Sequence, residues 1–163
     1  MAVWRMNLTG EMALPRTSHH ECGHALAALC LSIRVNEIIL GDGSAKVLGV
    51  TNHRRPVDFR DGLLISVAGS VGESLGGYGD AYDLFVMHPG CRGDRTDFDR
   101  ANSGNISRAE AIRRCRLMLS PHVALLRGLA QNLVELRRLD ADQVESIVQS
   151  YESHFRRQVR LCT

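Results

Sequence analysis

Two histidines and a glutamate near the start of the chain have the spacing of a pair of metal ligands with an adjacent base. His20 and His24 are separated by three residues, and Glu21 follows the first of them. On a helix, side chains four positions apart lie about 40° apart around the axis and one turn along it, so both imidazoles can reach one ion. Imidazole binds zinc at about 2.0–2.1 Å. The spacing therefore predicts a metal site on a helix.

Glu21 lies beside the face that carries the two histidines, where it can accept a proton but is poorly placed to bind the same ion. Zinc lowers the pKa of a water that it binds to about 7, and a nearby carboxylate can pass the released proton to a leaving amine. The pattern His20-Glu21-Cys22-Gly23-His24 thus predicts the chemistry of a zinc peptidase. The alternative is a helix whose histidines only cap or pack.

Two histidines do not complete the ligand shell of a zinc ion, so a third protein ligand is expected from farther along the chain. The metzincin extension is absent, because Ala27 and Cys30 stand where a glycine and a histidine would be needed. Spacing alone does not choose among the other candidates. These are Glu73, His88, Cys91 and Asp97.

The elements that must position these residues are expected to be mostly helices. A helix rich in small residues, capped by Thr17 or Ser18, should run to about Leu31 and carry the two histidines. Residues 35–40 and 45–51 are β-prone and flank a Gly-Asp-Gly-Ser turn, which predicts a small β-hairpin next to that helix. Further helices are expected over about 58–75, 97–102, 107–119, 120–134 and 140–151, with a loop over about 76–95.

Composition indicates a single soluble domain over residues 1–163, with a weakly structured start up to Pro15. Hydrophobic residues make up 44% and charged residues 23%, which is typical of a globular chain. The net charge of +2 does not indicate a nucleic-acid binder, and no apolar run approaches the ~20 residues of a membrane helix. Five cysteines without a Cys-x-x-Cys pair indicate reduced thiols and a cytoplasmic location.

Four blocks of the sequence, in order, resemble the peptidase domain of the FtsH-type zinc metalloproteases. Residues 18–28 resemble the active-site helix of that family, and residues 48–51 resemble the strand that follows it. Residues 67–75 resemble its Ala-Gly-x-x-Ala-Glu helix, and residues 93–101 resemble its Gly-x-x-x-Asp-Leu-x-x-Ala segment. The resemblance extends over about 17–148, and the ATPase and transmembrane parts of that family have no counterpart in this sequence.

The resemblance implies that Asp97 is the third zinc ligand beside His20 and His24, with Glu21 as the catalytic base. It also implies that Glu73 supports the site from a neighbouring helix and ranks second as a ligand. One zinc ion per chain is the implied cofactor. The edge strand on which a peptide substrate would lie extended consists of Leu48, Gly49, Val50 and Thr51.

These observations predict a zinc metalloendopeptidase that hydrolyses peptide bonds in unfolded or flexible protein segments without ATP. One alternative is a protease that cuts a single regulatory partner at one site. Another is a metal-stabilised binding or adaptor module without turnover, and the presence of Glu21 argues against it because a binder has no need of a base. A polypeptide is the expected partner, neither nucleic acid nor membrane is expected to be one, and the oligomeric state is not indicated.

Overall fold

The computed structural model describes residues 10–41, 49–56, 58–104 and 106–161 of the chain. It is mainly helical (73%) with a small three-stranded antiparallel sheet, which confirms the expected fold class at that level. The helices are α1 (Gly10–Cys30), α2 (Phe59–Leu75), α3 (Ala81–Met87), α4 (Arg92–Ala101), α5 (Arg108–Leu119), α6 (Val123–Leu136) and α7 (Ala141–Leu161). The strands are β1 (Val35–Leu40), β2 (Gly49–His53) and β3 (Arg138–Asp140).

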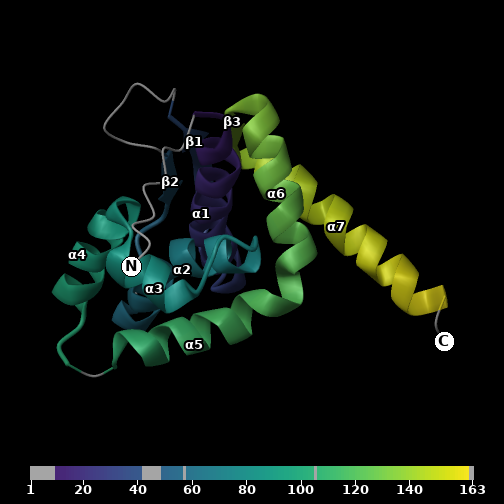
Figure 1. Cartoon of the computed structure of the whole chain (residues 1–163). Coiled ribbons are helices and arrows are strands. Elements are labelled where there is room, and N and C mark those ends of the chain that lie inside the picture. Colours follow the sequence, from purple (N-terminus) through teal and green to yellow (C-terminus); the bar gives the residue numbers. More distant parts are fainter. Residues whose placement is uncertain (1–9, 42–48, 57, 105, 162–163) are drawn as a thin grey trace.

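Helix α1 lies in the middle of the molecule, between the sheet and α6, and α2 packs across it (Figure 1). Its inner face is built from small side chains that are fully buried, among them Cys22 and Ala25. The contact with α2 is close, because a Cβ on Gly23 would lie 2.3 Å from the carbonyl oxygen of Ala68. Small residues at this crossing therefore bring the histidine-bearing part of α1 directly against α2.

The start of α1 differs from the prediction. The helix begins at Gly10 and runs through Pro15, whereas the sequence predicted a cap at Thr17 or Ser18. A proline inside a helix removes one backbone hydrogen bond and crowds the carbonyl four residues earlier, yet here the helix extends on both sides of it. Of the expected weakly structured start, residues 10–15 are helical and residues 1–9 lie outside the described part of the chain.

The sheet confirms the predicted antiparallel pairing, although the second strand runs to His53 and residues 42–48, with most of the predicted turn, lie outside the described residues. It also has a strand that the sequence did not predict. β1 pairs antiparallel with β2, with Ile38 opposite Thr51, and also antiparallel with β3, with Ile38 opposite Leu139. The strand order is β2-β1-β3, so β2 is an edge strand that runs beside α1 (Figure 1). β3 has three residues and forms where Arg137, with φ 65°, ends α6 and turns the chain back to β1.

The segment predicted as a loop over about 76–95 is largely helical. Asp80 caps α3 by accepting a hydrogen bond from the Tyr82 amide at 2.9 Å, and α4 begins at Arg92, five residues earlier than expected. In the structure, the side chain of Asp58 caps α2 and that of Ser107 caps α5. Among the described helices, none is long and apolar enough to cross a membrane. The early start of α4 places its first turn against α2 and determines which acidic residue reaches the histidines.

Candidate metal centre

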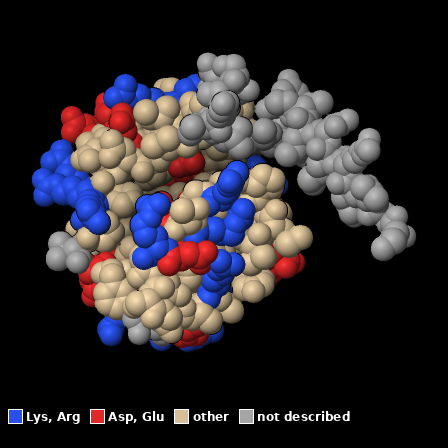
Figure 2. Space-filling model, turned by 90° about the vertical axis from the view of Figure 1, so that its left-hand side faces the viewer, with Lys and Arg blue, Asp and Glu red and all other residues tan. Residues whose placement is uncertain are grey.

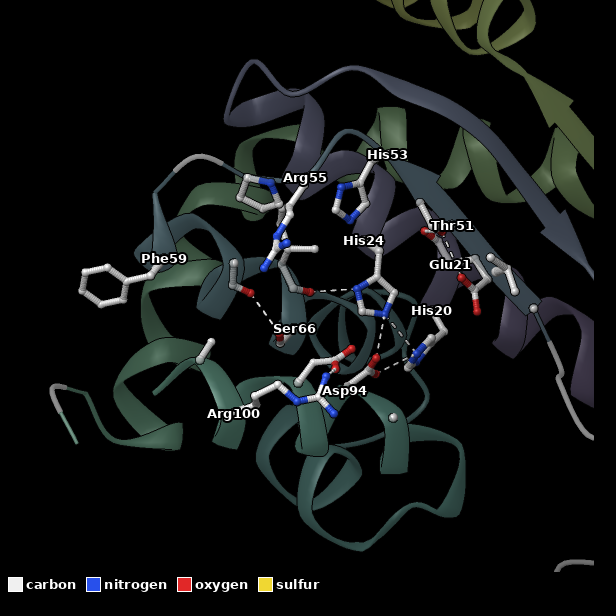
Figure 3. A pocket seen from close by; sticks show the side chains of 18 of the residues that line it. His20, Glu21, His24, Thr51, His53, Arg55, Phe59, Ser66, Asp94 and Arg100 are labelled. Carbon is white, nitrogen blue, oxygen red and sulfur yellow. Dashed lines mark hydrogen bonds and ion pairs between the residues drawn. The ribbon is translucent and has the colours of Figure 1, made fainter. Parts of the chain in front are cut away.

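A cleft of about 1020 Å³ opens between β2 and helices α2 and α4, with α1 at its floor (Figure 3). The side chains of His20 and His24 reach it from successive turns of α1, and their Nε2 atoms are 3.2 Å apart. Asp94, from the first turn of α4, faces both rings. Its Oδ2 is 3.1 Å from the Nε2 of His20, and its Oδ1 is 3.5 Å from the Nε2 of His24.

The other nitrogen of each imidazole is already hydrogen-bonded. The Nδ1 of His20 is 2.8 Å from Glu73 Oε1, and the Nδ1 of His24 is 2.8 Å from the carbonyl oxygen of Ile65. Both partners are acceptors, so each Nδ1 carries the proton and donates it. Each Nε2 then presents its lone pair to the cleft, which is the tautomer that a metal-binding histidine needs.

The three facing atoms form a group that positive charge would stabilise. With both Nδ1 atoms protonated, the Nε2 atoms of His20 and His24 and the Oδ2 of Asp94 are all acceptors, and Asp94 Oδ2 is buried without a hydrogen-bond donor. Acceptors at this separation repel unless a proton or a metal ion lies among them. The arrangement therefore fits a metal ion bound by two nitrogens and one carboxylate, and these residues could hold one.

The pKa values of these groups express the same preference for positive charge. Burial alone lowers the pKa of His20, but Asp94, Cys91 and Glu73 stabilise the protonated imidazole, outweigh burial and raise the pKa well above its ordinary value. Burial alone raises the pKa of Asp94, but the charges and hydrogen bonds of His24 and His20 outweigh it and hold the pKa well below its usual range. The site thus stabilises positive charge on one side and negative charge on the other.

Glu73 lies behind His20, on α2, and is 2% exposed. Its Oε1 accepts the Nδ1 proton of His20, and its Oε2 is paired with the Nε of Arg16, which precedes His20 by one turn of α1. Burial raises the pKa of Glu73, but the hydrogen bonds and charges of His20 and Arg16 outweigh burial and lower it. Glu73 also belongs, with His20 and Cys91, to a second buried group that could hold a metal ion. In that group, the proton of His20 Nδ1 is already shared with Glu73.

Asp97 does not join the histidines. Its side chain is 65% exposed, lines the outer part of the cleft and is paired with Arg100 at 3.2 Å. Asp94 precedes it by three residues on α4 and occupies the position beside the imidazoles that the resemblance assigned to Asp97. Asp94 was not among the ligands expected from the sequence. The signal was the aspartate directly after Gly93, and using it would have required knowing that α4 begins at Arg92.

The backbone of α2 must come very close to the two imidazoles, and Gly69 makes this feasible. A Cβ at Gly69 would lie 2.5 Å from the Nε2 of His20 and 2.6 Å from the Nε2 of His24. Real Cβ atoms are not found at such distances, and any side chain there would displace the rings. Gly69 therefore forms the wall against which both imidazoles are held, although the sequence analysis gave it no role.

Glu21 is 7% exposed and lines the cleft next to β2. The hydroxyl of Thr51 lies 2.9 Å from Glu21 Oε2 and 2.8 Å from the Glu21 carbonyl oxygen, so it can donate to either (Figure 3). A Cβ at Gly49 would lie 2.6 Å from the Glu21 Cγ, so the strand passes close to this side chain. Val50 is 47% exposed and also lines the cleft, and Leu48 lies outside the described residues. The predicted strand residues thus include two that contact the candidate base.

Comparison with models of protein families gives no match to this chain, and comparison with curated proteins gives none either. The chemistry of the centre is accordingly inferred from the arrangement of its own residues.

Proposed function

We propose that this chain is a zinc-dependent peptidase whose metal is bound by His20, His24 and Asp94. The observation that carries the proposal is the convergence of three acceptor atoms at one point of the cleft, beside the carboxylate of Glu21. Two imidazoles and one carboxylate are a donor set of catalytic zinc sites, which keep a further position open for water or substrate. The open side of this group faces the cleft.

Glu21 is the proposed general base. Zinc, when bound, would polarise the peptide carbonyl and lower the pKa of a water to about 7. Glu21 would accept a proton from the attacking water and return it to the leaving nitrogen, so that the carboxylate ends the cycle unchanged. Thr51 would hold the carboxylate through Oε2 and leave Oε1 directed to the substrate. The contact with Gly49 restricts the other side of Glu21.

An extended peptide segment is the proposed substrate. β2 is paired on one side with β1, and it forms one wall of the cleft. A peptide can add to such an edge through main-chain hydrogen bonds only when it is extended, which favours unfolded or flexible segments. The sequence contains no Gly-x-x-x-x-Gly-Lys-Ser/Thr loop, so the proposed hydrolysis does not use ATP in this chain. The resemblance to FtsH-type peptidases supports the same reaction.

Metal removal tests the proposal. The purified chain should contain close to one zinc and should cleave an unfolded substrate such as casein. Treatment with a chelator should abolish cleavage, and stoichiometric zinc should restore it, as measured by metal analysis and by mass spectrometry of the products. A chain that binds zinc but cleaves no unfolded substrate, with or without added ATP, would contradict the peptidase and favour a binding module.

The Glu73→Gln variant should bind zinc about 10–100-fold more weakly, which is the usual effect of losing a partner that orients a ligand. Glutamine retains the volume and an acceptor oxygen for His20, but it removes the charge that makes the imidazole a better donor to the metal. A competitive zinc titration measures the effect.

The matched control for that titration is Glu110→Gln, which removes an acidic group paired with Arg113 and Arg114 on α5, far from the histidines in sequence. Circular dichroism should show both variants folded. Equal zinc affinities in the two variants would show that Glu73 does not orient the ligand.

A further inference from the structure

We propose that the cleft selects a carboxylate of the substrate near the scissile bond, and that Arg55 is the residue that selects it. This inference rests on the proposed peptidase function, because it concerns the part of the same cleft that lies beyond the metal centre. It assigns a substrate chemistry, which the metal ligands and the base do not determine.

The alternation of a strand places Arg55 on the wall of the cleft. Gly49, Thr51, His53 and Arg55 line the cleft, as do Val50 and Pro56, whereas Asn52 and Arg54 do not. Successive side chains of an extended chain point to opposite sides, so every second residue from Gly49 shares one face. The Arg54 amide donates to the Arg34 carbonyl oxygen at 3.0 Å, which continues the pairing beyond the end of β2.

Arg55 would lie beside a bound peptide a few residues away from the scissile bond. Arg55 follows Thr51 by four positions, which is about 13 Å along an extended chain. Thr51 contacts Glu21, and His53 lies between Thr51 and Arg55 on the same wall. A peptide that pairs with this edge and presents its scissile bond to Glu21 would therefore place a side chain two to four residues away next to Arg55.

The charge of Arg55 is not neutralised by the described residues around it. Its guanidinium has no ion pair or hydrogen bond with any of them. Of the other acidic residues that line the cleft besides Glu21 and Asp94, Asp58 accepts a hydrogen bond from the Arg60 amide at 2.8 Å, and Asp97 is paired with Arg100. A free guanidinium directed into a cleft is a binding group for a carboxylate.

Arg100 adds a second guanidinium from the opposite wall. Figure 3 shows Arg55 entering the cleft from the strand side and Arg100 lying on the α4 side. One nitrogen of Arg100 is bonded to Asp97, and a guanidinium has five N–H donors, so others remain for a ligand. Figure 2 shows this face of the molecule, where Arg side chains border the hollow. A carboxylate between the two walls would meet the guanidinium of Arg55 on one side and the remaining N–H donors of Arg100 on the other.

The carboxylate can come from an aspartate or glutamate side chain or from the C-terminus of a peptide. The test uses unstructured peptides that differ only in carrying Glu or Gln at one position, moved through four positions on each side of the cleaved bond. Each peptide is made with a free and with an amidated C-terminus. We expect one position at which Glu raises kcat/KM about fivefold over Gln, an effect that falls with added salt.

Arg55→Glu should reverse that preference so that Gln is cleaved faster than Glu, with zinc content unchanged. The matched control is Arg54→Glu, which makes the same charge reversal at the neighbouring residue outside the cleft and should keep the preference. A preference for Glu over Gln that persists in amidated peptides assigns the carboxylate to a side chain, whereas faster cleavage of free than of amidated peptides, with Glu and Gln alike, assigns it to the C-terminus. An unchanged preference in Arg55→Glu, or equal changes in both variants, would overturn the proposal.

A binding assay distinguishes a failure of the carboxylate site from a failure of the proposed peptidase reaction. Fluorescence anisotropy of the same labelled peptides with zinc-loaded Glu21→Gln protein should show Glu bound more tightly than Gln, and Arg55→Glu in that background should remove the difference. A binding preference without cleavage by the wild-type chain would refute the peptidase and retain the carboxylate site. Cleavage by the wild-type chain without any preference for Glu in either assay would refute the carboxylate site and retain the peptidase.

Discussion

Glu21→Gln is expected to abolish peptide hydrolysis and to leave zinc bound. Glutamine has nearly the same shape and keeps an oxygen that can accept the Thr51 hydroxyl proton, but it cannot take a proton from water. Loss of a positioned general base lowers the rate by about 10²–10⁴. Measured on the same preparation, casein cleavage should therefore be lost, whereas the zinc content should stay close to one ion per chain.

Thr51→Val gives a graded comparison for that result. It removes the hydroxyl that contacts Glu21 while keeping a branched side chain on the strand, so we expect a smaller fall in kcat than for Glu21→Gln, with zinc retained. Equal cleavage by wild type and Glu21→Gln would show that Glu21 is not the base. Simultaneous loss of zinc in Glu21→Gln would show that the residue contributes to metal binding instead.

Asp94→Asn is expected to remove zinc from the protein, and Asp97→Asn is expected to keep it. Asparagine at position 94 removes the negative charge that faces both Nε2 atoms, so two imidazoles alone must hold the ion. The loss of affinity should exceed the about 10–100-fold that the loss of an orienting partner costs. Asp97 makes its ion pair with Arg100 and is well exposed, so its replacement leaves the three ligand atoms in place.

Zinc analysis after dialysis, combined with competitive titration, measures both variants. The pair is well matched, because the two aspartates lie three residues apart on one helix and undergo the same chemical change. If Asp97→Asn loses zinc and Asp94→Asn retains it, the resemblance assigned the ligand correctly and the geometry of α4 in the bound protein differs from the one described. An anomalous-scattering map at the zinc edge would identify the ligands directly.

Local patterns in the sequence were sufficient for several elements. The His20-Glu21 pattern predicted a helix that carries both histidines, and α1 does so. The caps at Ser107 and Asp140 depend only on residues three positions away, and both are present in the structure, with Asp140 and Gln143 exchanging hydrogen bonds at 2.9 Å. The β1–β2 hairpin was likewise predicted from neighbouring β-prone stretches.

The remaining features depend on contacts between distant residues. β3 has three residues and exists through its pairing with β1, about a hundred positions earlier, so its own sequence gives no strand pattern. Gly69 is required by the imidazoles of α1, which local sequence does not reveal. The identity of the acidic residue beside the histidines depends on the first residue of α4, and helix ends are the least certain part of a sequence-based prediction.

Because Asp94 lies on α4, a metal ion at this site would stabilise the fold as well as take part in catalysis. Phe98 is the one described residue of α4 that is buried, so this helix has little apolar surface of its own to hold it against the body. An ion shared by α1 and α4 would tie the two together. A ligand that binds only the native arrangement stabilises it by about 2.7 kcal/mol at a hundredfold excess over Kd. Under this proposal, the supply of zinc would set the thermal stability of the chain together with its activity.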